Sequence, residues 1–389
     1  MHWFDFNIDF FGATITTDLT RLSTASLSPQ EVDGQVAALK ADLDRVAAKM
    51  KTAIAKQSKQ SLFGGDEDEP MTTMHLVDPE LLPLLEVFPV IDVSPAGLDA
   101  ARAVAVAMEP EEMGAADGLQ VAIEERMIGG PQGPDSLRIL ILRPTGFSTV
   151  RRGAILHVHG GGYVIGRPEL SLAFLRATVA VQGCIVVTVD YRLAPEATWE
   201  GATEDGYAAL TWLAGNAGSL GVDESRIGIM GESAGGGLAA AIALIARDRK
   251  GPVLAFQNLL YPMLDDRTVT RADQNPVTGE FIWTRTHNHH GWTAYLGHTP
   301  GADAVSHYAA PARATELAGL PPTWIGVGGL DLFLDEDTDY ALRLNAAGVP
   351  VDFVIYPGAY HAFEQSPEGA ISARANADRQ AALHRALAV

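Results

Sequence analysis

The feature that most constrains the fold is the pentapeptide Gly-Glu-Ser-Ala-Gly at residues 231–235, because of the segments on either side of it. Residues 226–230 are typical of a buried strand, and residues 236–246 are rich in Ala, Leu and Ile without a proline, as in a helix. A serine between a strand and a helix must occupy a tight turn, where glycines two residues away on either side avoid Cβ collisions. The sequence therefore predicts a nucleophile elbow that presents the Ser233 hydroxyl at a helix N-terminus.

A run of three glycines is the second informative feature. Residues 159–162 read His-Gly-Gly-Gly and follow an apolar strand-like segment. Glycines in this position let backbone N–H groups approach a ligand without interference from side chains. A phosphate cradle is the alternative interpretation, but the Gly-Lys-Ser/Thr ending of a P-loop is missing. We therefore expect the N–H groups of Gly161, Gly162 and Ala234 to form an oxyanion hole.

An acid and a base follow the serine in the order Ser, Asp, His. Asp331 lies just after a predicted strand at residues 322–328, and His361 lies in the loop after the next predicted strand. Because the carboxyl ends of parallel strands meet at one edge of a sheet, both side chains should come close to Ser233. His361 is then expected to take the Ser233 proton, and Asp331 to orient the imidazole.

Several other polar residues have an ordinary structural explanation beside a functional one. Asp335 is an alternative acid, but it belongs to an acidic cluster of the kind that favours a helix N-terminus. His287, His289 and His290 form a histidine-rich stretch, yet no Cys or His-Glu-x-x-His pattern supports a metal site. We interpret the stretch as part of a solvated cap segment, and His157 as a buried structural residue.

With these motifs the chain resembles the bacterial hormone-sensitive-lipase-like family of α/β-hydrolase esterases. The resemblance extends from about Leu76 to the C-terminus. It rests on the segments at 159–162, 191–196 (Tyr-Arg-Leu-Ala-Pro-Glu), 231–235 and 261–266 (Tyr-Pro-Met-Leu-Asp-Asp), and on the Asp331 and His361 loops. It implies a serine carboxylesterase for short- to medium-chain acyl esters, with a helical cap and with no metal or organic cofactor. It also implies that His159 and Gly160 are supporting members of their motif.

Two departures from the family pattern bear on substrate preference and pH optimum. Glu232 stands where members usually carry Asp or Thr, and residues 331–333 read Asp-Leu-Phe where Asp-Pro-Leu is usual. Neither departure removes a catalytic group. Two interpretations of Glu232 stay open: its carboxylate tunes His361, or it forms a hydrogen bond with a neighbouring loop.

The order of elements predicts an α/β fold. Eight candidate strands lie near 121–128, 137–143, 153–158, 184–190, 226–230, 253–260, 322–328 and 350–356. From residue 153 onward they are short, rich in Val, Ile and Leu, and separated by helical stretches, which is typical of a mostly parallel sheet flanked by helices.

The long interval between Tyr261 and Pro321 contains no good strand. It carries four aromatic residues in an apparent helical spacing, namely Phe281, Trp283, Trp292 and Tyr295. We expect this insertion to cover the site and line an acyl pocket. The family resemblance adds a second segment, so the expected cap comprises residues from about 76–115 and 263–320, within a catalytic domain at 71–389.

Residues 1–70 do not fit this pattern. A β-like start at residues 3–17 precedes one amphipathic helix, which begins at the capping sequence Ser-Pro-Gln-Glu of residues 28–31. An acidic linker at 64–70 follows. Two explanations stay open: an element that packs on the cap or on another subunit, to which we give slight preference, or a foreign segment fused upstream of Met71.

Composition limits the classes of partner. The chain has 389 residues and a net charge of −20, which argues against unaided nucleic-acid binding. It has no uninterrupted apolar stretch long enough to span a bilayer, and its start does not resemble a signal peptide, so we expect a cytoplasmic location. The single cysteine, Cys184, is expected in the core. We expect a small ester as substrate. The N-terminal helix or the cap is a candidate contact surface for a homo-oligomer.

The same triad and oxyanion hole also serve amidases, lactonases and acyltransferases. Besides an esterase and these related enzymes, a third possible class of protein is a ligand receptor with this fold whose catalytic base has been lost. The presence of His361 argues against this class.

Overall fold

The chain divides into two units, Met1–Phe63 and Gly64–Val389. The computed structural model describes residues 7–10, 13–16, 73–89, 91–107, 119–145, 150–367 and 369–388. In the first unit β1 (Asn7–Phe10) and β2 (Ala13–Thr16) pair antiparallel, within the β-like start expected from the sequence. The expected helix after Ser28 and the acidic linker lie outside the described residues.

The second unit contains one eight-stranded sheet in the order β10-β9-β8-β7-β5-β6-β4-β3. Its strands are β3 (Val121–Gly130), β4 (Gly133–Pro144), β5 (Arg152–Val158), β6 (Ile185–Val189), β7 (Val222–Glu232), β8 (Gln257–Leu260), β9 (Thr323–Gly328) and β10 (Val351–Tyr356). The six strands from β10 to β6 in this order pair in parallel, and β4 and β3 are antiparallel additions. The predicted mostly parallel sheet is therefore confirmed.

One strand is shorter than predicted. The sequence suggested a strand from about residue 253, but β8 begins at Gln257. The Ala255 N–H still donates to Ile227 O at 2.7 Å, so the preceding residues run beside β7 without joining the regular ladder.

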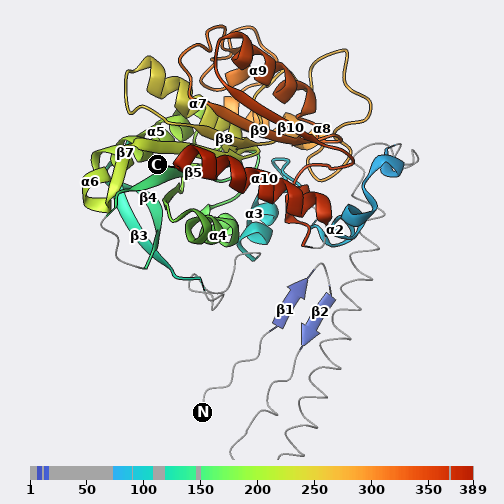
Figure 1. The fold of residues 1–389 in the computed structure, drawn as a ribbon. Helices are drawn as coiled ribbons and strands as arrows, with labels where there is room; N and C mark the ends of the chain where they lie inside the picture. The colour runs from blue at the N-terminus through green and yellow to red at the C-terminus, as the bar shows by residue number, and fades with distance from the viewer. Residues whose placement is uncertain are drawn as a thin grey trace, which may run out of the picture. The chain divides into compact units, whose positions relative to one another are not determined.

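Helices cover both faces of this sheet (Figure 1). Alternate strand residues contact different helices because successive side chains point to opposite faces. Ile155 packs in the cluster that includes α4 (Leu172–Gln182) and α10 (Ala370–Leu387). Leu156 packs in the main core, to which the helices of the other face contribute; these are α5 (Trp199–Gly215), α7 (Ala234–Asp248) and α9 (Leu334–Ala346). The short α6 (Ala217–Leu220) precedes β7.

The segment between β8 and β9 contains α8 (Arg285–Leu296) and no strand, as predicted. The expected helical spacing of its aromatic residues is only half right. Trp292 and Tyr295 lie on α8, whereas Phe281 and Trp283 precede the helix, because Thr284 caps its N-terminus by accepting from the His287 N–H.

Shorter helical elements complete the second unit. Before β3 lie α2 (Leu82–Val87) and α3 (Leu98–Ala107). Single 3-10 turns occur at Met74–Leu76, Pro79–Leu81, Pro168–Ser171, Pro311–Arg313 and Phe363–Gln365. No helix in the described part of the chain has both the length and the apolarity needed to cross a membrane.

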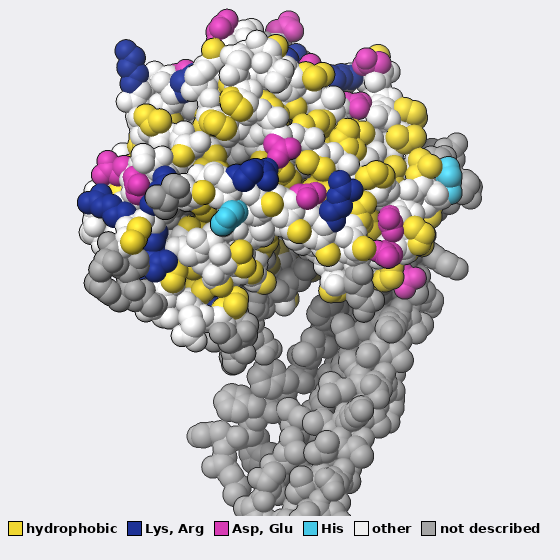
Figure 2. Space-filling view, in the orientation of Figure 1, with side chains coloured by type: hydrophobic (Ala, Val, Ile, Leu, Met, Phe, Trp, Pro, Cys, Tyr) yellow, Lys and Arg dark blue, Asp and Glu magenta, His cyan; other side chains and the backbone are white. Residues whose placement is uncertain are grey.

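The surface crossed by α10 carries acidic and basic side chains interspersed with hydrophobic ones (Figure 2). On this face the described residues form no continuous basic stripe, which agrees with the acidic overall composition.

Candidate active site

Ser233 occupies the turn between β7 and α7 in an unfavourable backbone conformation. Its φ is 56° and its ψ is −125°, a region that costs a non-glycine residue about 1–3 kcal/mol. A Cβ on Gly231 would collide with the Gly235 carbonyl, and a Cβ on Gly235 would collide with the Val158 carbonyl. The spacing of the two glycines therefore has the steric reason expected from the sequence.

Backbone hydrogen bonds hold this turn against the neighbouring segment. The Ser233 N–H donates to Leu260 O at 2.9 Å, and the Ser233 carbonyl accepts from the Met263 N–H at 2.9 Å. The turn is thus tied to the end of β8 and to the first residues of the insertion.

Ser233, His361 and Asp331 lie in one hydrogen-bonded line at the carboxyl edge of the sheet. His361 Nε2 is 3.0 Å from Ser233 Oγ, and His361 Nδ1 is 2.8 Å from Asp331 Oδ2. The other Asp331 oxygen accepts from the Phe333 N–H at 3.0 Å. In the tautomer that carries its proton on Nδ1, the imidazole donates to the carboxylate and Nε2 is free to accept from the serine hydroxyl.

The alternative acid lies elsewhere. Asp335 is exposed in the first turn of α9 and accepts from Asn275 Nδ2 at 3.0 Å. Asp331 is 1 % exposed, and it is Asp331 that the fold brings to His361.

Aromatic rings surround the imidazole of His361. The ring centroids of Tyr261, Phe333 and Trp283 lie 4.4, 5.3 and 6.4 Å from that of His361. The Trp283 Nε1–H donates to Asn288 Oδ1 at 3.1 Å, which fixes the indole relative to α8. His361 itself is only 6 % exposed, so its ring is largely shielded from bulk water.

The glycine loop at residues 159–162 lies directly against the elbow. A Cβ on Gly160 would come within 3.0 Å of Glu232 O, and one on Gly162 would collide with the Trp283 ring. Among the described residues no acceptor is found for the N–H groups of Gly161 and Gly162. Ala234 is the first residue of α7, so its N–H has no intrahelical acceptor either.

His159 stabilises this loop through a ring contact and a hydrogen bond. Its ring stacks on Tyr191 with centroids 4.3 Å apart, and its Nδ1 lies 2.8 Å from Gly160 O. Burial lowers the pKa of His159 to about 4, so the side chain is neutral near pH 7. The Tyr191 hydroxyl donates to His159 O at 3.0 Å.

Glu232 forms hydrogen bonds with two neighbouring elements. Its Oε2 lies 3.0 Å from His157 Nε2 on β5, and its Oε1 accepts from Arg379 Nη2 on α10. Burial by itself raises the pKa of Glu232, but the positive charge of Arg379 and the hydrogen bonds from His157 and Arg379 outweigh burial and lower the pKa to about 2. His157 is fully buried, as expected from the sequence.

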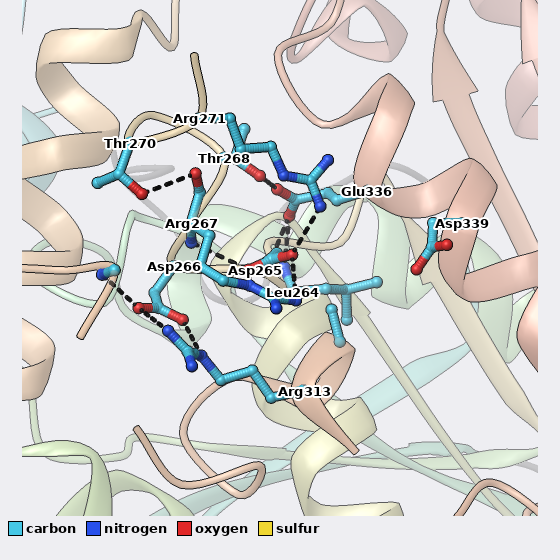
Figure 3. A network of polar contacts seen from close by, with 12 residues as sticks. Leu264, Asp265, Asp266, Arg267, Thr268, Thr270, Arg271, Arg313, Glu336 and Asp339 are labelled. Atoms are coloured by element: carbon cyan, nitrogen blue, oxygen red, sulfur yellow. Dashed lines mark hydrogen bonds and ion pairs between the residues drawn. The ribbon is translucent and has the colours of Figure 1, made fainter. Parts of the chain in front are cut away.

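Acidic residues hold the base of the insertion in a network of polar contacts (Figure 3). Glu336 on α9 accepts from the N–H groups of Leu264 and Asp265, at 2.6 and 3.2 Å, and from the Thr268 hydroxyl. Because Met263 binds the Ser233 carbonyl, this short segment links the serine turn to the helix that follows Asp331.

A second carboxylate links the beginning of the insertion to its later part. Asp266 accepts from Arg313 Nε at 2.6 Å, from Arg313 Nη2 at 2.9 Å and from the Gly301 N–H at 2.7 Å. Asp266 is fully buried. A bidentate ion pair between Asp266 and Arg313 therefore joins these two parts of the insertion.

The histidine-rich stretch has a structural use. His287 completes the capping box of α8, since its Nδ1 lies 3.4 Å from the Thr284 N–H. No group of three or more His, Cys, Asp or Glu in a metal-binding arrangement occurs within the described residues. Cys184 is buried, and burial raises its pKa to about 12.

Sequence reasoning did not identify Glu336 or Arg379 as residues near the site. Arg379 did leave a signal, because it falls on the buried stripe of α10 between Ala375 and Ala382. A charged residue at a core position of a helix requires a buried partner. Glu336 belongs to the acidic cluster in the first turn of α9, and nothing in its spacing distinguishes it from the exposed Asp335.

Several known proteins are similar to this chain in sequence and structure. A family profile described as "alpha/beta hydrolase fold" matches residues 155–365. The carboxylesterase NlhH of Mycobacterium tuberculosis is 35% identical over 307 residues, which is 76% of this chain and 91% of that protein. The esterase LipI of the same species is 37% identical over 238 residues, 60% of this chain and 72% of that protein.

A solved structure titled "Bacterial Heroin Esterase" superposes with a TM-score of 0.75 at 38% identity, covering 82% of this chain and 100% of that one. The chain belongs to the hormone-sensitive-lipase-like family of bacterial esterases within the α/β hydrolases, and it is a carboxylic ester hydrolase.

Proposed function

We propose that this protein is a serine carboxylesterase that hydrolyses short- to medium-chain acyl esters through an acyl-enzyme intermediate. The observation that supports it is the line of contacts from Asp331 Oδ2 to His361 Nδ1 at 2.8 Å and from His361 Nε2 to Ser233 Oγ at 3.0 Å. These distances suit general-base activation of a serine hydroxyl.

In the first half of the reaction, His361 Nε2 takes the Ser233 proton as Oγ attacks the ester carbonyl carbon. The N–H groups of Gly161, Gly162 and Ala234 stabilise the negative charge on the carbonyl oxygen. The tetrahedral intermediate collapses, and the departing alkoxide takes the proton from His361 and leaves as the alcohol. Asp331 stabilises the transient imidazolium by accepting from Nδ1–H.

In the second half, a water molecule gives its proton to His361 and its oxygen attacks the acyl carbon. Collapse of this second intermediate releases the carboxylic acid and returns the proton to Ser233. The chain supplies every group in this sequence, so the proposed reaction requires no cofactor.

Residues from about 76–115 and 263–320 are assigned to the cap that covers the site. Within the described part, the Tyr360 hydroxyl donates to Leu81 O at 2.7 Å, directly beside His361. Arg102 on α3 donates to Val164 O at 2.9 Å, just after the glycine loop. The first cap segment therefore contacts both loops of the site, and the Trp283 ring of the second segment lies 6.4 Å from the His361 ring. This enclosure favours a pocket of limited size and short acyl chains.

The test is the hydrolysis of p-nitrophenyl esters from acetate to palmitate, with Ser233→Ala as the control. Rapid turnover of short chains that disappears in the variant is the expected result. Activity on long chains alone would replace the short-chain preference with a lipase-like opening of the cap. No Ser233-dependent hydrolysis of any ester in the series would contradict the proposal and favour an amide or lactone substrate.

A further inference from the structure

A row of polar side chains crosses the buried face of the sheet beneath α10. His157 on β5 pairs in register with Thr188 on β6 and with Met230 on β7, and Met230 pairs with Asn258 on β8. Glu232 lies two residues beyond Met230, so its side chain points to the same face. Thr188, His157 and Asn258 are each 1 % exposed or less, within a face that is otherwise apolar.

The members of this row are joined by hydrogen bonds from end to end. Thr188 Oγ1 lies 2.8 Å from His157 Nδ1, and His157 Nε2 lies 3.0 Å from Glu232 Oε2. Because an ionised carboxylate only accepts, His157 donates through Nε2–H, and the Thr188 hydroxyl can then donate to Nδ1.

Arg379 closes the row from α10. Its Nε donates to Asn258 Oδ1 at 2.8 Å, its Nη2 donates to the second Glu232 oxygen, and its guanidinium lies 4.2 Å from the centroid of the Phe174 ring on α4. Arg379 is 2 % exposed. Both carboxylate oxygens of Glu232 are thereby fixed, one by the sheet and one by the C-terminal helix.

This arrangement adjoins the one strained residue of the proposed mechanism. Ser233, immediately after Glu232, has φ of 56°, and such a conformation persists only where its surroundings hold it. A buried ion pair adds little net stability in general, because desolvation of both charges offsets their attraction. Stability alone is therefore a weak reason to bury a charged pair at this position.

We infer that Glu232 and Arg379 are positioning residues: α10 holds the serine elbow in its strained, reactive geometry through the Arg379–Glu232–His157 row. The inference rests on the proposed function of Ser233. Loss of either charged partner lets the turn relax, so that Ser233 Oγ moves relative to His361 Nε2 while the substrate pocket is unchanged.

The experiment compares Glu232→Gln, Arg379→Met and the double variant in the full chain. Active sites are counted with a fluorophosphonate probe, and kcat per counted site is measured with p-nitrophenyl butyrate. Each single variant should lose about 10- to 100-fold in kcat per site with KM within about twofold, since small misplacements at a reactive centre have effects of this size. The double variant should resemble the single ones, because the two residues act as a unit.

Gln380→Met is the matched control on the same helix. Gln380 donates to Thr178 Oγ1 at 2.6 Å and accepts from Gln182 Nε2 at 2.9 Å, so its loss weakens the contact between α10 and α4 without touching Glu232. Its kcat per site should equal that of the wild type even if the melting temperature falls. Wild-type kcat per site in both Glu232 and Arg379 variants, with only their melting temperatures lowered, would overturn the inference.

Two further measurements keep the test decisive. Thr188→Val is nearly isosteric and removes only the hydroxyl beside His157, so a smaller loss of about threefold in kcat per site is expected even if Arg379→Met does not fold. The rate constant for phosphonylation of Ser233 by the probe should fall in parallel. That rate does not depend on ester turnover, so it distinguishes failure of the positioning role from failure of the proposed esterase function.

Discussion

At the scale of single residues, charge and burial separate carboxyl groups that look alike in the sequence. Asp331, Asp335, Glu336 and Asp337 lie within seven positions, yet three of them are buried, Asp335 is exposed, and only Asp331 contacts His361. Burial, together with the neighbouring carboxyls of Glu336 and Asp331, raises the pKa of Asp337 well above its usual range. Both of its carboxyl oxygens lack a hydrogen-bond partner among the described residues.

The first residue-scale prediction concerns the acid. Asp331→Asn should lower kcat for p-nitrophenyl acetate by about 10⁴-fold, because the amide cannot hold the imidazole in the required tautomer. Asp335→Asn should stay within about twofold of wild type, since a surface hydrogen bond to Asn275 has little energetic weight. A crippled Asp335→Asn beside a nearly normal Asp331→Asn would reverse the assignment.

The second concerns Asp337. Its folded-state pKa is raised, so the folded state keeps a proton that the unfolded chain releases above about pH 4, and stability is lost as pH rises from there toward the folded pKa. Asp337→Leu, whose side chain branches at the same carbon although its methyl groups are larger than the carboxyl oxygens, should therefore stabilise the protein by about 1–3 kcal/mol near pH 8 and by less at pH 5. Urea unfolding at both pH values measures the difference.

Asp339→Leu is the control for this comparison, because the Asp339 side chain is 54% exposed. It should leave the unfolding free energy within about 0.5 kcal/mol at either pH. Equal stability of wild type and Asp337→Leu at pH 8 would mean that the Asp337 carboxyl has a stabilising partner.

At the scale of elements, α8 packs directly against the glycine loop. Gly291 faces the loop so closely that a Cβ would lie 2.8 Å from Gly162 O and 3.3 Å from the Trp283 ring. Glycine has a lower helix propensity than alanine, but at this position the absence of a Cβ is what allows the helix to approach the loop. Within the second unit, α8 and the glycine loop are in direct van der Waals contact.

Gly291→Ala should lower kcat by about tenfold, because the new methyl group displaces Gly162 and with it a proposed oxyanion donor. Stability should change little, since the gain in helix propensity, about 1 kcal/mol, offsets the steric cost. Steady-state kinetics and thermal unfolding measure the two effects separately. Gly215→Ala at the exposed end of α5, where nothing lies near the added Cβ, should keep wild-type kcat.

At the scale of the whole molecule, the chain separates into a hydrolase unit and an N-terminal unit that ends at Phe63. Every residue of the proposed mechanism belongs to the hydrolase unit. The two explanations for the first 70 residues, a packing or oligomerisation element and a fused segment, differ in what their removal does.

Deletion of residues 1–70 should leave kcat on p-nitrophenyl acetate within about twofold, because no group of the triad is removed. Light scattering and thermal unfolding of the truncated protein decide between the two explanations. A smaller assembly or a lower melting temperature is expected if the segment packs on the cap or on another subunit. Unchanged size, stability and activity would favour a fused segment.

Local sequence was sufficient to predict the fold and the residues that meet at the site. The elbow, the glycine loop and the loops after β9 and β10 depend on short-range rules: strand periodicity, glycine sterics and the common edge of parallel strands. For this reason Ser233, Asp331 and His361 could be named before any coordinates, and the contacts at 3.0 and 2.8 Å join those same three residues.

Only the tertiary structure decided the roles of residues whose partners are distant in sequence. Glu232 meets Arg379 across 147 positions, and Glu336 meets Leu264 across 72. No local pattern encodes such a pairing, because it depends on which helix covers which strand and on how deeply each charge is buried. Burial also separates Asp337 from Asp335. A carboxyl group in water favours the charged form, whereas the same group in the core favours the protonated form.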